Sequence, residues 1–375
     1  MSCAYLILEN GAVFKGESFG FDGEAIGALV FSTGMAGYME TLTDPRNTGQ
    51  IVLQTFPLIG NYGVISAEKR STEVSLKAYI VREWCQEPSN FRSEGNLDSF
   101  LRLNRIPGLY GVDTRALTRV IRENGTMNAM ISFRPELSAE QWLQLRGYTT
   151  EGAVSACAEK LNGSADGKQE GFVMPYGEQR NSQFTIHNSQ FNIAVWDFGD
   201  SARLTTGLLS VGFSIPKTFG HGIAAEQILA MNPDGVALSG GPGDPTENVA
   251  IIGEIKKLCD NGIPIFAVGL RHQMLALALG ASCVKLPFGH RGANQPVKEL
   301  NTERVFVTTQ NHGYAVAPDS LPENAAISYE NINDGTCEGV EYTDIPAFSI
   351  QFDPTDEIFE KFAVKMQSAT AKGGV

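Results

Sequence analysis

The stretch AVGLRHQMLALALG, residues 267–280, has the residue types of a sharp strand–turn–helix junction. An apolar run at 263–268 reaches a turn at Gly269, and an amphipathic apolar segment follows. In α/β enzymes this kind of turn, a nucleophile elbow, exposes a nucleophilic side chain at the mouth of the sheet. Gly269 has no side chain, so the pattern predicts the elbow without the nucleophile.

Two further stretches could bind a polar ligand beside this turn. The glycine-rich loop SGGPGDP, residues 239–245, follows a short apolar run, and loops of this kind present backbone N–H groups to a carboxylate or an oxyanion. The stretch QNHGY, residues 310–314, lies further along the chain, with FSIQ at 348–351 downstream. We interpret the three stretches as parts of one candidate site.

Together these stretches resemble the class I, triad-type glutamine amidotransferases. Four N-terminal stretches make the resemblance more specific, and they are STGMAGYMETLTDP (32–45), IGNYGV (59–64), SNFR (89–92) and GVDTRALTRVIRENG (111–125). They are similar to the small, glutaminase subunit of carbamoyl phosphate synthetase. The resemblance covers nearly the whole chain and implies an α/β fold. It implies an N-terminal mixed α/β domain, and then an amidotransferase-like domain whose central, mostly parallel sheet has helices on both faces.

The family hydrolyses glutamine with a Cys–His–Glu triad, and this chain departs from it at each position. The family's G-I-C-L-G-H-Q elbow corresponds to residues 267–273, which places Gly269 at the nucleophile. Its Q-G-H-P-E motif corresponds to 351–355, which places Asp353 at the base and Thr355 at the orienting carboxylate. Glycine cannot attack a carbonyl, and an ionised aspartate is a much weaker base than imidazole near pH 7. We therefore expect no glutaminase activity, with Asp353 remaining only as a candidate proton-transfer group.

The positions that contact glutamine in the family are better preserved. The resemblance assigns this role to Gly241, Gly243, Leu270, Gln273, Asn311 and Gly313, and to Tyr314 where the family usually has phenylalanine. The pocket is therefore expected to accept glutamine or a related small amino acid or carboxylate.

Three changes alter the charge expected in that pocket. Arg46 stands where the family has a serine, and Arg271 replaces the second glycine of the elbow, whereas Ala202 replaces a lysine. Arginine suits bidentate recognition of carboxylates, so Arg46 and Arg271 predict an anionic ligand. The alternative is an ion pair between Arg271 and Asp353 that fills the vacant pocket, and the residues alone leave both interpretations open.

Composition limits the remaining function classes. The formal net charge of the 375 residues is −13, which disfavours nucleic acid and anionic membrane surfaces as partners. No stretch of about 20 apolar residues is present, and the N-terminus lacks the pattern of a signal peptide, so a cytoplasmic location is expected. The six cysteines form no C-x-x-C pair, so neither a metal site nor a cofactor is predicted.

The pattern of apolar runs and polar stretches predicts two domains and a linker. Residues 1–134 combine short β-rich segments with helical patterns, including a capped amphipathic helix at 114–123. Residues 135–190 are polar and poor in large apolar residues, which indicates a linker containing one short helix near 139–145. Residues 191–375 alternate apolar strands with helices, which is typical of a parallel sheet covered on both faces.

Three functions remain open at this point. The first is a pseudo-glutaminase without catalytic activity, acting as a scaffold or regulatory partner of a synthetase-like large chain. The second is a repurposed enzyme that uses the pocket for chemistry without a covalent thioester, for example an intramolecular condensation in which Asp353 moves protons. The third is a sensor of glutamine or a related metabolite. The sequence determines neither the identity of the ligand nor the oligomeric state, so assembly into a homo-oligomer stays an open alternative.

Overall fold

The computed structural model describes residues 2–157 and 191–373, and the chain divides into two units. The first unit contains the residues up to Ala153 together with Leu286–Asn294, and the second contains Val154–Lys285 together with the chain from Gln295 onward. Residues 158–190, most of the expected linker, lie outside the described residues. The described part of the expected linker, residues 135–157, contains the expected short helix α4 (Ala139–Arg146), which begins with a capping box at Ser138.

The first unit is built on a closed barrel of short strands. Its strand order is β1-β2-β8-β6-β4-β3-β9, formed by β1 (Cys3–Leu8), β2 (Val13–Gly20), β3 (Ala25–Ser32), β4 (Gln50–Gln54), β6 (Ala78–Ile80), β8 (Pro107–Tyr110) and β9 (Met127–Ser132). The unit also contains the small pair β5 (Leu58–Ile59) and β7 (Glu83–Trp84), and the helices α1 (Tyr38–Leu42), η1 (Pro45–Asn47), η2 (Ser66–Glu68), α2 (Leu97–Leu103) and α3 (Thr114–Asn124). The Asp113 carboxylate caps α3 by accepting from Ala116 N at 3.0 Å, which confirms the expected capped helix.

The second unit contains a nine-stranded sheet whose order is β11-β10-β12-β13-β18-β17-β15-β14-β16. The first five strands are mutually parallel, and they are β11 (Ser214–Phe219), β10 (Asn192–Trp196), β12 (Gly235–Leu238), β13 (Ile265–Val268) and β18 (Ala347–Ile350). Antiparallel pairing extends the sheet through β17 (Cys337–Tyr342), β15 (Val305–Val316), β14 (Cys283–Glu299) and β16 (Ala325–Asn331). This confirms the predicted mostly parallel sheet.

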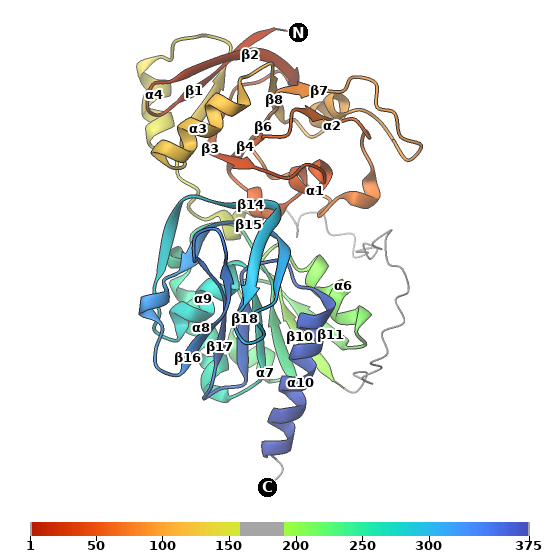
Figure 1. Ribbon diagram of the computed structural model, residues 1–375, viewed down its shortest axis with the longest axis vertical. Helices are drawn as coiled ribbons and strands as arrows, with labels where there is room; N and C mark the ends of the chain where they lie inside the picture. Colours follow the sequence, from red (N-terminus) through yellow and green to blue (C-terminus); the bar gives the residue numbers. More distant parts are fainter. Residues whose placement is uncertain (1, 158–190, 374–375) are drawn as a thin grey trace. The chain divides into compact units, whose positions relative to one another are not determined.

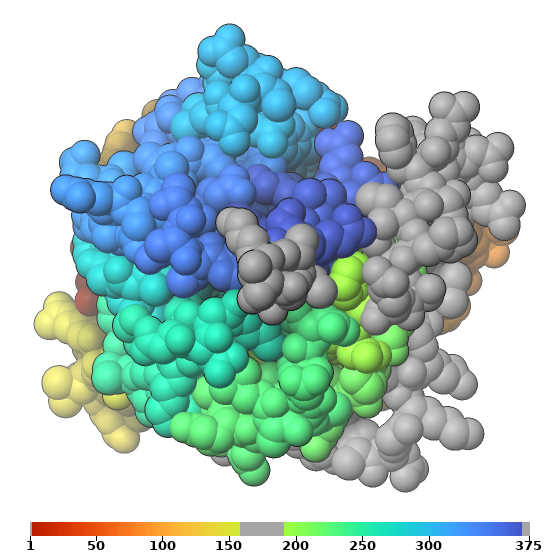
Figure 2. Space-filling model, turned by 90° about the horizontal axis from the view of Figure 1, so that it is seen from below, coloured from red at the N-terminus to blue at the C-terminus, as the bar shows by residue number. Residues whose placement is uncertain are grey.

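Helices cover both faces of this sheet (Figure 1). The sheet has a hydrophobic core on each face, and successive side chains of a strand point to opposite faces. In β10, Ala194 and Trp196 belong to the first core, and Ile193 and Val195 belong to the second. The first core is completed by α7 (Ala225–Leu229), α8 (Val249–Asn261) and α9 (Leu270–Ala278). The second is completed by α6 (Ala202–Ser210) and α10 (Asp356–Gly373), which lie beside each other where light green meets dark blue in Figure 2.

This arrangement brings the candidate site to one edge of the sheet. The loops that follow β10, β12, β13 and β18 all leave the carboxyl ends of parallel strands, where α/β proteins bind their ligands. Two short 3₁₀ helices, η4 (Pro245–Glu247) and η5 (Pro318–Ser320), complete the unit. Among the described residues, no helix is both long and apolar enough to cross a membrane.

Candidate functional site

The elbow predicted at Gly269 is present between β13 and α9. Gly269 has φ 61° and ψ −121°, a backbone conformation that residues with a side chain rarely adopt, and its N–H donates to Ile350 O at 2.9 Å. Among the described residues, a Cβ at this position would meet Gly240 Cα at 3.6 Å and Gln351 O at 4.0 Å and no other heavy atom within 4 Å. The positive-φ turn and the space at its tip are therefore both present, although the residue itself carries no reactive group.

The glycine loop after β12 is held close to the end of β10. The Ser239 hydroxyl accepts from Phe198 N at 2.9 Å, and a Cβ on Gly241 would come within 2.8 Å of Phe198 O. Only glycine fits at position 241 without a shift of the backbone, because real Cβ contacts are essentially never that short. Gly243 has φ 99°, which again favours glycine. Both loop positions expected to contact a ligand thus have a structural reason to be glycine.

Arg271, in the first turn of α9, is completely buried at 0% exposure. Its guanidinium lies on the ring of Phe198, with Cζ 3.4 Å from the ring centroid, and its Nη1 contacts the Met274 sulfur. Within residues 2–157 and 191–373, Nε and Nη2 have no hydrogen-bond partner. Burial holds the pKa of Arg271 well below its usual range, and the carboxylate of Asp197 acts in the opposite direction. The site therefore contains a buried cation whose donors are mostly unused.

Asp353 pairs with an arginine that sequence reasoning did not predict. Its Oδ2 accepts from Arg203 Nη1 at 2.7 Å, and the Asp353 side chain is 6% exposed. The ion pair considered between Arg271 and Asp353 is therefore wrong as an account of this pocket, because Arg271 stacks on Phe198 instead. Thr355, at the third triad position, is exposed just before α10, and its carbonyl accepts from Ile358 N.

A hydrogen-bonded chain joins α9 to the strands beside it. Gln273 Nε2 donates to Tyr314 O at 2.7 Å and to Gln351 Oε1 at 2.8 Å. Gln273 Oε1 is buried and has no partner within the described part of the chain. Burial raises the pKa of the Tyr314 hydroxyl, and the negative charge of Asp244 in the glycine loop acts in the same direction. The phenylalanine expected at this position from the resemblance would lack this hydroxyl.

Comparison with known proteins decides the family. Residues 6–131 match the family described as carbamoyl-phosphate synthase small chain, CPSase domain, and residues 194–357 match glutamine amidotransferase class-I. The chain is 42% identical over 369 residues to the carbamoyl phosphate synthase small chain of Clostridium perfringens, covering 96% of this chain and 98% of that protein. The chain belongs to the carbamoyl phosphate synthase small-chain family.

Other relatives of the same name agree along nearly the whole length. The small chain of Caldanaerobacter subterraneus subsp. tengcongensis is 39% identical over 367 residues, covering 96% of this chain and 95% of that protein. The small chain of Syntrophotalea carbinolica is 40% identical over 383 residues, covering 97% and 98%. The family and the two-part fold expected from the motifs are thereby confirmed.

The small-chain fold places most of the expected ligand positions at one edge of the sheet. Leu270 and Gln273 are buried in α9, and Asn311, Gly313 and Tyr314 belong to β15. Arg46 lies in η1 of the first unit. Its Nε donates a hydrogen bond to Asp44 Oδ1 at 3.0 Å, and its Nη2 donates one to Asp44 Oδ2 at 2.9 Å. Its expected contact with the ligand stays a prediction.

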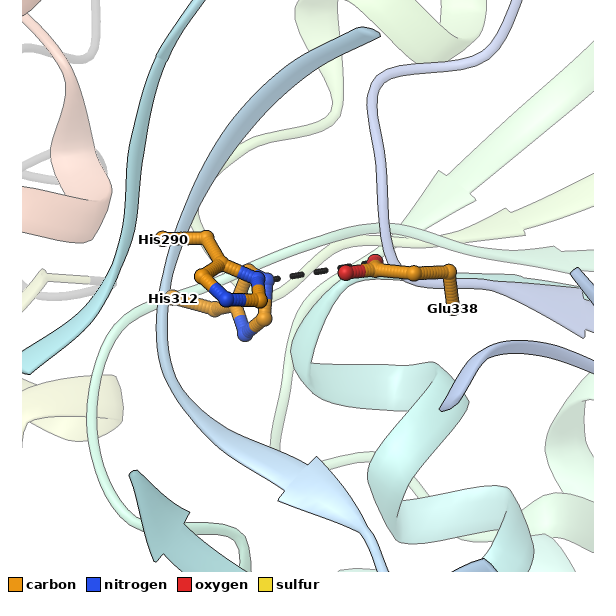
Figure 3. Close-up of side chains that lie close together, drawn as sticks. All are labelled: His290, His312 and Glu338. Atoms are coloured by element: carbon orange, nitrogen blue, oxygen red, sulfur yellow. Dashed lines mark ion pairs between the residues drawn. The ribbon is translucent and has the colours of Figure 1, made fainter. Parts of the chain in front are cut away.

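The two histidines of the motif stretches are held by internal hydrogen bonds. His272 Nδ1 lies 2.8 Å from Ser349 Oγ, and burial lowers the pKa of His272 to about 3. His312 contacts Gln310 Oε1 and Tyr314 O, and its Nε2 is 4.0 Å from the buried Glu338 (Figure 3). His290, also drawn in Figure 3, lies on the part of β14 that belongs to the first unit. Neither His272 nor His312 stands at the base position, which Asp353 occupies.

Sequence reasoning missed Arg203 and Phe198. Both lie in DFGDSAR, residues 197–203, where the resemblance implies a lysine at the position of Ala202. Arg203, the cationic residue directly after Ala202, could have been recognised as a substitute for that lysine. Nothing in the sequence marked Phe198 as the ring on which Arg271 stacks, because that contact depends on how the loop after β10 packs against α9.

Proposed function

We propose that this small-chain homologue does not hydrolyse glutamine. The observation that carries the proposal is an intact elbow with no nucleophile: Gly269 keeps φ 61°, while Asp353 and Thr355 stand where the family has its base and orienting residue. Covalent catalysis needs a nucleophile at the elbow tip and a base to activate it. Gly269 supplies no nucleophile there, and the carboxylate of Asp353 is a much weaker base than an imidazole. Triad members act as a unit, so the loss of all three is expected to lower the rate by several orders of magnitude.

We further propose that the pocket still binds glutamine or a related small amino acid or carboxylate. Three observations support binding without turnover. The glycine loop keeps Gly241 and Gly243, the tip of the elbow keeps space, and buried polar atoms of α9 lack hydrogen-bond partners among the described residues. Decay toward a filled apolar pocket would not leave an uncompensated guanidinium there. Ligand binding accounts for the retained features more simply than decay does.

The proposed role is that of a regulatory or scaffold subunit for a synthetase-like large chain. The relatives are named as small chains, which supports the existence of a larger partner. One departure from the resemblance counts against an unmodified mode of partnering. The resemblance implies a Pro- and Gly-rich loop after position 355 that faces the partner, whereas α10 begins here at Asp356, directly after Thr355. The repurposed-enzyme alternative needs Asp353 as a proton carrier, and the engagement of its carboxylate by Arg203 disfavours that role.

Ammonia release from glutamine tests the first proposal. The wild-type protein is expected to match the protein-free control at every glutamine concentration. Gly269→Cys alone is expected to stay inactive, because the base and its orienting residue are still missing. The triple variant Gly269→Cys, Asp353→His, Thr355→Glu restores the residue types of the triad and serves as the positive control. A wild-type rate that saturates with glutamine and persists through repurification overturns the proposal.

A further inference from the structure

The guanidinium of Arg271 changes the class of ligand that this pocket can hold. We infer that the pocket selects an amino acid whose side chain ends in a carboxylate, a glutamate-like dicarboxylate, over the neutral amide glutamine. The inference rests on the proposed function, because it requires a pocket that binds an amino acid without hydrolysing it. It goes further by assigning the selectivity to one residue of α9.

The first step is the position of the charge. Arg271 follows the elbow tip by two residues and stacks on Phe198, the residue whose carbonyl also limits the space at Gly241. Gly240, which precedes Gly241 in the loop after β12, is the nearest neighbour of a side chain built on Gly269. The guanidinium therefore lies against the loop after β10 and the elbow tip against the loop after β12, and these two loops contact each other at Phe198, Ser239 and Gly241.

The second step is the missing compensation. Nε and Nη2 of Arg271 are buried without a hydrogen-bond partner among the described residues, and Asp353 is paired with Arg203 instead. The carboxylate of Asp197 acts on Arg271 only through space, and no ion pair of Arg271 is formed among the described residues. A buried guanidinium without an ion pair costs free energy, and its position in the first turn of α9 adds to this cost because the helix N-terminus carries partial positive charge. A ligand carboxylate would supply both the charge and the acceptor oxygens that the Nε–Nη2 edge lacks.

The third step is discrimination between an acid and its amide. The terminal group of glutamine is neutral, and its NH₂ group would meet further donors of Arg271 and of the helix N-terminus. A carboxylate presents only acceptors to the same groups. The chemistry of the orphaned donors therefore favours the acid.

The fourth step concerns access. Arg271 is fully buried, so a ligand reaches its free edge only when the Phe198 loop moves away from the glycine loop. The Phe198 ring lies 5.0 Å from the buried indole of Trp196. Ligand binding is therefore expected to change the tryptophan fluorescence of the protein, in addition to the heat that calorimetry measures.

Titration calorimetry with L-glutamate and L-glutamine tests the inference. For wild-type protein, glutamate is expected to bind at least about tenfold more tightly than glutamine, the order of effect for a desolvated charge pair. Arg271→Gly, which restores the family residue, and Arg271→Met, which keeps the helix and the bulk, are expected to abolish this preference. Arg304→Ala removes an equal charge from an exposed side chain of the same unit and is expected to preserve it. Circular dichroism confirms that each variant is folded.

The possible results separate the two proposals. If wild-type protein binds glutamine as tightly as glutamate or more tightly, the inference is overturned while the proposed ligand pocket stands. If Arg271→Met and Arg271→Gly both keep the glutamate preference, Arg271 does not determine it and the inference is likewise overturned. If neither amino acid binds, the proposed pocket itself is wrong, and the inference falls with it.

Discussion

At the tip of the elbow, Gly269 keeps a backbone conformation that the missing nucleophile would have needed. Its φ of 61° is tolerated by glycine without strain, whereas any residue with a Cβ would pay a conformational penalty. The neighbouring Arg271 shows a different change, because a charged side chain now lies buried beside the elbow. Gly269 therefore adopts the turn without strain, and Arg271 places a buried charge beside it that forms no ion pair among the described residues.

Gly269→Ala is expected to lower the free energy of unfolding by about 1 kcal/mol, because the space is adequate but the positive φ disfavours a side chain. Gly253 provides a matched control, because it lies inside α8 with nothing within 4 Å of an added Cβ. Gly253→Ala is expected to stabilise the protein by a similar amount, since alanine is the better helix former. Urea denaturation measures both changes, and a Gly269→Ala variant as stable as wild type contradicts the elbow geometry.

His272 is expected to make the protein less stable in acid. Burial lowers its pKa to about 3 in the folded chain, against about 6.5 when unfolded, so the unfolded state binds the extra proton between those values. Stability contributed by neutral His272 is complete above pH 6.5 and is lost as the pH falls, with a slope of up to about 1.4 kcal/mol per pH unit. His272→Asn should reduce that slope in denaturation curves measured between pH 4 and pH 6.5. An unchanged slope contradicts the assignment.

At the scale of elements, the site depends on contacts between α9, β15 and the glycine loop. Gln273 provides one of these contacts through Tyr314 O, and the Tyr314 hydroxyl lies within electrostatic reach of Asp244 in the glycine loop. Tyr314→Phe is expected to cost about 1 kcal/mol of stability, the usual net value of one polar contact, and to leave the hydrogen bonds of Gln273 in place. Thermal unfolding monitored by circular dichroism checks this, and an unchanged melting temperature would argue against the contact.

The sequence predicted β10, β12 and β13, because continuous apolar runs such as the one ending at Val268 are typical of buried parallel strands. It did not predict β11, whose residues 214–219 alternate with polar side chains, nor that β18 pairs in parallel with β13. It did not predict β14, whose 17 residues contain two prolines and two glycines and therefore resemble a loop. It also did not predict that the first unit closes into a barrel, because closure depends on pairing between strands distant in the sequence. The same limit explains the incorrect partner for Asp353, since Arg203 reaches it from α6, 150 residues earlier.

At the scale of the whole molecule, the small-chain family relation predicts assembly with a large chain. Similarity to the Clostridium perfringens small chain covers 96% of this chain and 98% of that protein. Co-expression with a synthetase-like large chain encoded in the same genome is expected to give a complex that survives size-exclusion chromatography. Deletion of residues 356–373, the helix α10, would not be a fair control because α10 contributes to the second core. Separate elution of the two chains contradicts the scaffold role.

The absence of glutamine hydrolysis is the claim on which the account depends, and a single-turnover experiment tests it most directly. Wild-type protein, in molar excess over amide-¹⁵N-labelled glutamine, is followed by NMR, alone and with the large chain when the complex forms. The account predicts that the amide signal persists and that no ¹⁵N-ammonium appears, while the triple variant carrying Cys, His and Glu at positions 269, 353 and 355 releases it. Stoichiometric ¹⁵N-ammonium release by the wild-type protein would contradict the account.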